Sequence, residues 1–307
     1  DPAAGEILIV EMINRARADA VAEATRLRNS ADPDVLSAIS FFNVDLDLME
    51  QQFATLQQTT RPLGINRRLT ATSRIHSLDM FNNEFQGHSS SNSPPDPYEA
   101  NDGVGDRTSK NGFSGAVGEN VYAYAQTYEH MHAGFNIDWG AEGSVGGMQS
   151  PPGHRINIHD PDSREIGVGI VHGTNGTVGP MVVTQVLGTR SGFDSPFLVG
   201  VTIVDSDGDG FYDIDEGLGG VRVEVDGAVF YADSSSEGAY AMPLHGDGAY
   251  SVTFSKPGYA PQTVAFAVAN GESVKIDYLA VEAIDLDPVE MLGVELIGQD
   301  TLRMQVR

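Results

Sequence analysis

The sequence contains no cysteine among its 307 residues and only one tryptophan. Without cysteine there are no disulfide bonds, zinc-finger ligands or thiol nucleophiles, so a bound metal would need histidine, carboxylate or backbone oxygen ligands. Basic residues are also scarce: 18 Lys and Arg stand against 43 Asp and Glu, giving a formal net charge of -25. Nucleic-acid phosphates and anionic lipid headgroups would repel such a chain, so we expect neither nucleic-acid binding nor a membrane-surface role.

Long hydrophobic runs are absent as well, since none approaches the roughly 20 residues that a membrane-spanning helix needs. We therefore expect no transmembrane segment. The sequence opens at Asp1 and Pro2 without an initiator Met, which fits the removal of an export signal. A content of 40% hydrophobic and 20% charged residues is sufficient for packed cores, and the length predicts one large domain or two ordinary ones.

The first two thirds of the chain combine helical and strand patterns. Residues 88–118 are rich in Ser, Asn, Pro, Gly and Asp, which predicts a long surface loop. Strands are predicted over 165–171 and 181–187. Helices followed by strands indicate an α+β domain over residues 1–192. Apolar residues three and four positions apart predict its helices over 6–27, 32–42, 46–56, 69–85 and 119–139.

The composition changes after Gly192, where long helical periodicity disappears. Short alternating runs between turn signals predict a small antiparallel β-sandwich over residues 197–281. Residues 282–307 fit neither domain and are left unassigned. Two strands are predicted there, over 292–297 and 302–306, and they could pair with another copy of the chain. A structural subunit of an extracellular assembly is therefore one open alternative for the function.

The segment 205–216 has the spacing of an EF-hand-like calcium loop. Carboxylates occupy positions 1, 3, 5, 9 and 12, and glycine occupies position 6. Its flanks look like strands, so we predict a structural Ca²⁺ site rather than a sensor. The predicted Ca²⁺ ligands are Asp205, Asp207, Asp209, the carbonyl of Phe211, Asp213 and Glu216.

This loop and the motifs at 219–223, 234–240 and 248–252 resemble the calcium-binding B-type repeats of bacterial surface adhesins and the related carboxypeptidase-regulatory-like domains. The resemblance implies an Ig-like or transthyretin-like β-sandwich over residues 197–281. A domain of this kind would act as a spacer or adhesion module that bound Ca²⁺ makes rigid.

Four short motifs in the first domain point to a second family, and they lie at residues 85–89, 118–121, 135–138 and 151–158. The Gly-Glu-Asn and Gly-His-Arg-x-Asn-Ile sequences are the specific ones. In this order the motifs resemble bacterial members of the CAP superfamily of cysteine-rich secretory, antigen 5 and pathogenesis-related proteins. The resemblance implies an α-β-α sandwich and an extracellular or cell-surface location, with residues 30–60 as an insertion.

The resemblance also implies a central cavity lined by two histidines and two acids, which correspond here to His88, Glu119, Asp138 and His154. His88 and His154 would suit Zn²⁺ or another divalent ion, with the two carboxylates orienting the ring N–H groups. The same four side chains could perform general acid/base chemistry, so a metal-assisted hydrolase is an alternative. A purely structural hydrogen-bonding role is another.

The predicted function is therefore a secreted or surface CAP-family protein whose cavity binds a ligand or a divalent metal ion. A small molecule, a glycan, a lipid and a protein all stay open as ligands, and so does enzymatic activity. Three other histidines of this domain are weaker candidates: His76 is expected on the surface, and His130 and His132, of which at most one could reach the cavity, in exposed or capping positions.

Overall fold

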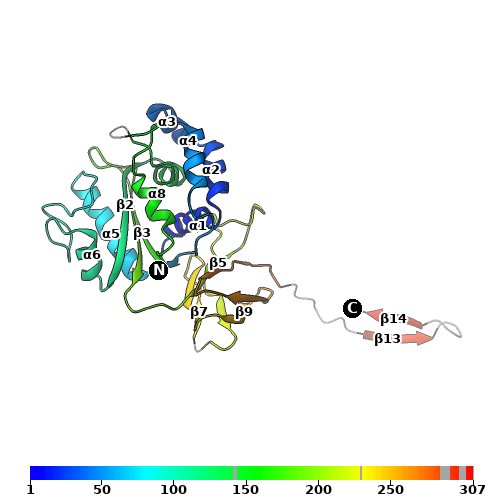
Figure 1. Cartoon of the computed structure of the whole chain (residues 1–307). Helices are drawn as coiled ribbons and strands as arrows, with labels where there is room; N and C mark the ends of the chain where they lie inside the picture. The colour runs from blue at the N-terminus through cyan, green and yellow to red at the C-terminus, as the bar shows by residue number, and fades with distance from the viewer. Residues whose placement is uncertain (141–143, 229, 284–290, 297–301, 307) are drawn as a thin grey trace.

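The computed structural model divides the chain into two parts (Figure 1). The first consists of helices packed around one sheet, and the second is built of strands. The α+β character predicted for the chain is confirmed, while the Ig-like or transthyretin-like assignment of the second part stays a prediction. The residues described are 1–140, 144–228, 230–283, 291–296 and 302–306.

The sheet of the first part has the strand order β1-β3-β4-β2. The short β1 pairs parallel with β3, and the other neighbours are antiparallel. Strands β3 and β4 are buried over most of their length because helices cover both faces of the sheet. The strands are β1 (Gly64–Ile65), β2 (Gly115–Ala125), β3 (Glu165–His172) and β4 (Met181–Arg190).

Helices form a layer on each side of this sheet (Figure 1). Helix α5 packs on β3 and β4 so closely that a Cβ at Gly167 would lie 2.0 Å from the backbone of Leu69. Helices α1, α7 and α8 contact β2 or β3 from the other side. The bounds are α1 (Ala4–Ala18), α5 (Arg67–Asn82), α6 (Val104–Lys110), α7 (Tyr128–Ala133) and α8 (Gly153–His159).

Residues 30–60, the predicted insertion, contain α3 (Pro33–Phe42) and α4 (Leu46–Ala54). With α2 (Ala20–Arg28) they share an apolar core that includes Trp139. The predicted helix over 6–27 is two helices, because the Asp19 side chain accepts a hydrogen bond from the backbone N–H of Ala22 at 2.9 Å and begins α2.

The predicted helix over 119–139 is wrong in its first half, which is strand β2. Residues 115–122 pair with β4, and buried Val121, Ala123 and Ala125 alternate with more exposed Tyr122 and Tyr124. Ala and Glu favour a helix locally, but pairing with a buried strand overrides that preference. The prediction of one long loop over 88–118 is also wrong in part, since this segment contains α6 and the start of β2.

The second part contains two sheets that enclose an apolar core. One has the order β10-β9-β6-β7, and in the other β5 pairs with β8, β11 and β12. The predicted antiparallel pairing is found for most strands but is wrong for two, because β11 and β12 both run parallel to β5. The Asp277 carboxylate, which accepts a hydrogen bond from the backbone N–H of Val201 at 2.9 Å, lies between these two short strands.

The strands of the second part are short and closely spaced along the chain. They are β5 (Phe197–Ile203), β6 (Arg222–Val225), β7 (Tyr231–Asp233), β8 (Ala239–Pro243), β9 (Gly248–Ser255), β10 (Gln262–Val268), β11 (Val274–Lys275) and β12 (Tyr278–Leu279). Beyond them, β13 (Met291–Leu296) and β14 (Leu302–Val306) pair antiparallel with each other. Ile297, the end of one predicted strand, lies outside the described residues.

Helix α1 contributes to the cores of both parts. Ile7, Leu8 and Met12 form one apolar cluster with Val201, Ile203 and Tyr212 of the second part. Two ion pairs cross the same interface, Lys275 with Glu11 at 2.7 Å and Arg61 with Glu272 at 2.9 Å. The two parts therefore share a packed boundary.

Candidate functional site

The four predicted cavity residues form two histidine–carboxylate pairs. His88 follows α5, and its Nδ1 lies 3.0 Å from Oε1 of Glu119 on β2. His154 is in the first turn of α8, and its Nδ1 lies 2.7 Å from Oδ1 of Asp138. Four segments that are far apart in the sequence thus bring these side chains together in pairs.

The carboxylates of the two pairs are buried, whereas the imidazoles reach the surface. The exposed fraction of the side chain is 59% for His88 and 2% for Glu119, and 21% for His154 and 0% for Asp138. With Nδ1 anchored on a carboxylate, Nε2 is the atom left on each ring for another partner. No group in the described part of the chain hydrogen-bonds to Nε2 of either histidine.

Glu119 is held in its ionised form. The fully buried Arg107 on α6 places Nη2 2.5 Å from Oε2 of Glu119 and also donates to the carbonyl of His88 at 3.0 Å. Burial alone would raise the pKa of Glu119, but the hydrogen bond from His88 and the charge of Arg107 keep that pKa below its usual value. The Glu119 carboxylate is therefore a fixed acceptor for the ring N–H of His88.

Asp138 ends a short π-helix, η1 (Gly134–Asp138), in a backbone conformation that non-glycine residues seldom adopt, with φ of 60°. This turn directs its carboxylate toward α8, where Oδ2 accepts from the backbone N–H of His154 at 2.9 Å. Arg155 fixes the same turn by donating to the carbonyls of Asn136 and Ile137. Single-turn π-helices and strained backbone positions recur at functional sites.

The Gly-Glu-Asn and Gly-His-Arg-x-Asn-Ile motifs are hydrogen-bonded to each other. Asn157 donates to the carbonyl of Glu119 at 3.2 Å and to Oδ1 of Asn120 at 2.9 Å, while Asn120 donates to the carbonyl of His154 at 3.3 Å. A Cβ at Gly118 would lie 2.8 Å from Oδ1 of Asn157, so a larger residue there would displace the Asn157 side chain from these contacts. These contacts set the spacing between the two pairs.

Both imidazoles line one cavity of about 540 Å³. His88, Glu119 and His154 line it, and Gln86 and Gln149 are among its other polar residues, whereas the fully buried Asp138 lies behind His154 and does not line the cavity as predicted. None of the described residues along its wall is a serine, threonine or cysteine. Hydrolysis at this place would therefore depend on an activated water molecule rather than on a side-chain nucleophile.

The other histidines are less exposed than predicted. His76 is fully buried and its Nε2 lies 2.8 Å from the carbonyl of Gly87, because the chain after α5 folds back over that helix. His132 is buried against Glu23 at 2.9 Å. His130 is buried too, but its Nδ1 accepts from the backbone N–H of Gln126 at 3.1 Å, a capping contact at the start of α7. His76 thus supports the turn that carries His88, a role that its helical position did not reveal.

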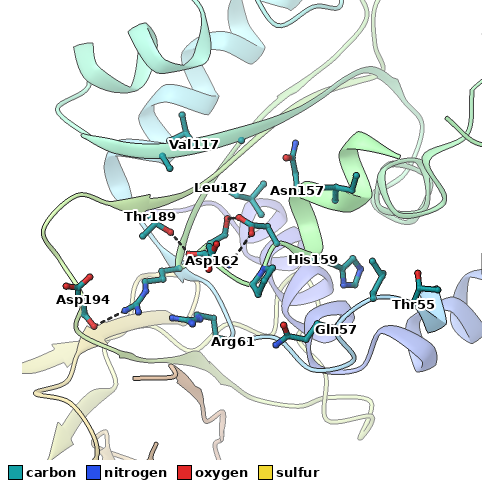
Figure 2. A pocket seen from close by; sticks show the side chains of 18 residues that line it. Thr55, Gln57, Arg61, Val117, Asn157, His159, Asp162, Leu187, Thr189 and Asp194 are labelled. Carbon is teal, nitrogen blue, oxygen red and sulfur yellow. Dashed lines mark hydrogen bonds between the residues drawn. The ribbon is translucent and has the colours of Figure 1, made fainter. Parts of the chain in front are cut away.

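A larger groove of about 820 Å³ lies beside the ends of β4 and α8 (Figure 2). Several of its polar groups already bond within the protein: Thr189 donates to the carbonyl of Asp162, and Arg164 to that of Asp194 at 2.8 Å. Burial lowers the pKa of His159, which also lines this groove, to about 3, so the ring is neutral at pH 7. None of the four predicted cavity residues lines the groove, so its size does not make it the candidate site.

The predicted calcium loop is compact. Asp205, Asp207 and Asp209 each offer a carboxylate oxygen, and these oxygens lie within 4.8 Å of one another. Glu216 at position 12 turns back toward them and accepts from the backbone N–H of Ser206 at 2.7 Å. Burial, followed by the negative charges of neighbouring acids, raises the pKa of Asp213. The carboxylates therefore repel one another.

The family model described as "CAP: Cysteine-rich secretory protein family" matches residues 10–187, which include most of the sheet, α5 and all four predicted cavity residues. No curated protein matches the chain. None of the described helices combines the length and the apolar character needed to span a bilayer.

Solved structures that are similar to parts of the chain include the following two. One is an extracellular protein containing an SCP domain from Bacillus anthracis, 19% identical, with a TM-score of 0.31, covering 53% of this chain and 45% of that one. The other is the pilus adhesin RrgA from Streptococcus pneumoniae, 13% identical, with a TM-score of 0.19, covering 45% and 25%. The chain thus spans less than half of either protein, and the family assignment depends on the family model.

Proposed function

Because this chain belongs to the CAP family of cysteine-rich secretory proteins, we propose that it is a secreted or cell-surface protein whose cavity binds a divalent metal ion between His88 and His154. One observation supports this most: each imidazole has Nδ1 fixed on a buried carboxylate, and both rings line one cavity. Histidines that ligate metals usually donate their other ring N–H to a carboxylate or carbonyl, which orients Nε2 toward the ion.

Zn²⁺ suits two imidazole ligands and leaves its remaining coordination positions to water or to a bound ligand. Glu119 is engaged by both His88 and Arg107, so it supports a ligand rather than acting as one. With two protein ligands, we expect weaker binding than at a structural four-ligand zinc site. A coordinated Zn²⁺ would supply an acidified water molecule, which is the chemistry that the hydrolase alternative requires.

Calorimetric titration with Zn²⁺, in the presence of excess Ca²⁺ to saturate the acidic loop, tests the proposal. We expect one Zn²⁺ per chain, and loss of that binding in a His88→Ala, His154→Ala double variant. His245→Ala, which removes an exposed imidazole from the second part, is the matched control and should bind as the unaltered chain does. Equal Zn²⁺ uptake by the double variant would mean that the cavity is not the site.

We also propose that the loop 205–216 binds Ca²⁺ and stiffens the second part as a spacer or adhesion module. The convergence of three Asp oxygens and the inward turn of Glu216 support this.

Tb³⁺ can replace Ca²⁺, and Tyr212 within the loop can sensitise its luminescence. We expect saturable Tb³⁺ emission that Ca²⁺ displaces, and tenfold or weaker binding in Glu216→Gln. Glu224→Gln, a charge-matched control at an exposed position of β6, should leave it unchanged, and similar losses in both variants would contradict the assignment.

A further inference from the structure

Beside the cavity lies a second pocket, of about 360 Å³, whose walls are mainly aromatic. The insertion supplies one wall: the ring of Phe42, the last residue of α3, stacks on that of Trp139 with 6.3 Å between centroids and 8° between planes. Strand β2 and the π-helix η1 supply the others. The five rings are those of Phe42, Tyr122, Tyr124, Phe135 and Trp139.

This aromatic pocket adjoins the histidine cavity, because Gln86, Val121, Gln149 and His154 line both. The boundary carries hydrogen-bonding groups. Oε1 of Gln86 accepts from the backbone N–H of Ala123 at 2.8 Å, which leaves its amide N–H groups for another partner. The His154 ring, whose Nδ1 is held by Asp138, lies 5.2 Å from the ring of Phe135. Apolar and polar binding surfaces are therefore continuous here.

The dimensions and the chemistry both favour a ring-shaped occupant. A dry cavity of about 150 Å³ is large enough to take up benzene, so 360 Å³ holds one ring with substituents or two fused rings. Aromatic walls gain from stacked and edge-on contacts with another ring, by about 0.5–1.5 kcal/mol for each pair. A net charge of -25 disfavours anionic ligands.

We propose that the aromatic pocket binds the apolar ring of a small neutral amphiphile whose hydrogen-bonding substituent points to His154 in the histidine cavity. The proposal names a ligand class for the cavity assigned above, and it depends on that assignment only for the polar end of the ligand. Phe42 lies in the predicted insertion, so this segment determines the selectivity of the pocket.

The single tryptophan of the chain, Trp139, lines the pocket, so its fluorescence reports occupancy directly. Benzyl alcohol is a suitable neutral probe because it does not absorb at 295 nm, where tryptophan is excited. We expect a saturable change in emission, and binding at least fivefold weaker in Phe42→Ala. Phe41→Ala is the matched control, since that neighbouring ring is 80% exposed and does not line the pocket, and it should bind normally.

Phe42 also packs in the core around Trp139, so Tyr124→Ser, which removes a ring that is 41% exposed, serves as a second variant that spares the fold. It too should weaken binding. Equal affinity in both pocket variants and in Phe41→Ala would overturn the proposal. So would tighter binding of 1-hexanol than of benzyl alcohol, because the pocket would then select chains rather than rings.

The metal proposal and this one can fail separately. His88 lines only the histidine cavity, so His88→Ala should weaken Zn²⁺ binding and leave benzyl alcohol binding intact. Benzyl alcohol binding without any Zn²⁺ uptake would support the aromatic pocket and refute the metal site. Zn²⁺ uptake without an emission change from benzyl alcohol would do the reverse.

Discussion

The interface between the two parts should make the stability of the chain depend on pH through Glu11. One lysine serves two carboxylates there, since Lys275 contacts both Glu11, at 2.7 Å, and Asp277. Burial, the largest cause, raises the pKa of Glu11 from its ordinary 4.5 to about 7 although Lys275 opposes the rise. Because the folded chain holds this proton more tightly than the unfolded chain, the contribution of Glu11 to folding improves as the pH falls from about 7 toward 4.5.

Replacing Glu11 by Gln should remove this dependence. Between pH 8 and pH 5 the shift corresponds to about 2–3 kcal/mol in the free energy of unfolding. For a chain of this size, the difference in melting temperature between Glu11→Gln and the unaltered chain should therefore change by roughly 5–10 °C from pH 8 to pH 5. Circular dichroism melts from pH 5 to 8 measure it. Glu272→Gln, which breaks the half-exposed pair with Arg61 at the same interface, is the control and should keep the pH dependence of the unaltered chain. Parallel pH curves for Glu11→Gln and the unaltered chain would refute the reasoning.

Three further predictions concern the other charged groups and the end of the chain. Arg107→Met leaves the buried Glu119 without its cation and should cost about 3–5 kcal/mol in chemical denaturation, whereas Arg222→Met, at an exposed pair, should have a much smaller effect. Chelation of Ca²⁺ should lower the melting temperature of the second part, and identical melts with and without chelator would contradict the calcium proposal. A chain ending at Leu279 should associate less in light scattering if the strands beyond it pair between copies, and unchanged association would remove that alternative.

The sequence predicted those helices and strands in which the spacing of apolar residues matches the pattern of buried residues in the structure. Helix α5 and strands β3 and β4 lie close to their predicted positions, and the family match confirms the CAP resemblance over most of the first part. The four residues that the CAP resemblance implied, including Asp138, form two histidine–carboxylate pairs in the structure. Whether these pairs bind metal stays a prediction.

The errors have one physical source, which is that distant segments decide local structure and burial. Residues 119–125 look helical alone and become a strand because β4 pairs with them. His76 lies on a polar face of α5 and is buried because the segment after that helix covers it. The aromatic pocket could not be predicted either, since Phe42 and Trp139 are brought together only by the packing of the inserted helices.

The most direct test of the metal site is anomalous diffraction at the zinc absorption edge from crystals soaked in Zn²⁺ with excess Ca²⁺. The proposal predicts one strong peak about 2.0–2.1 Å from Nε2 of both His88 and His154, with each Nδ1 still on its carboxylate. Absence of a peak in the cavity, or a peak only at the loop 205–216, would contradict it.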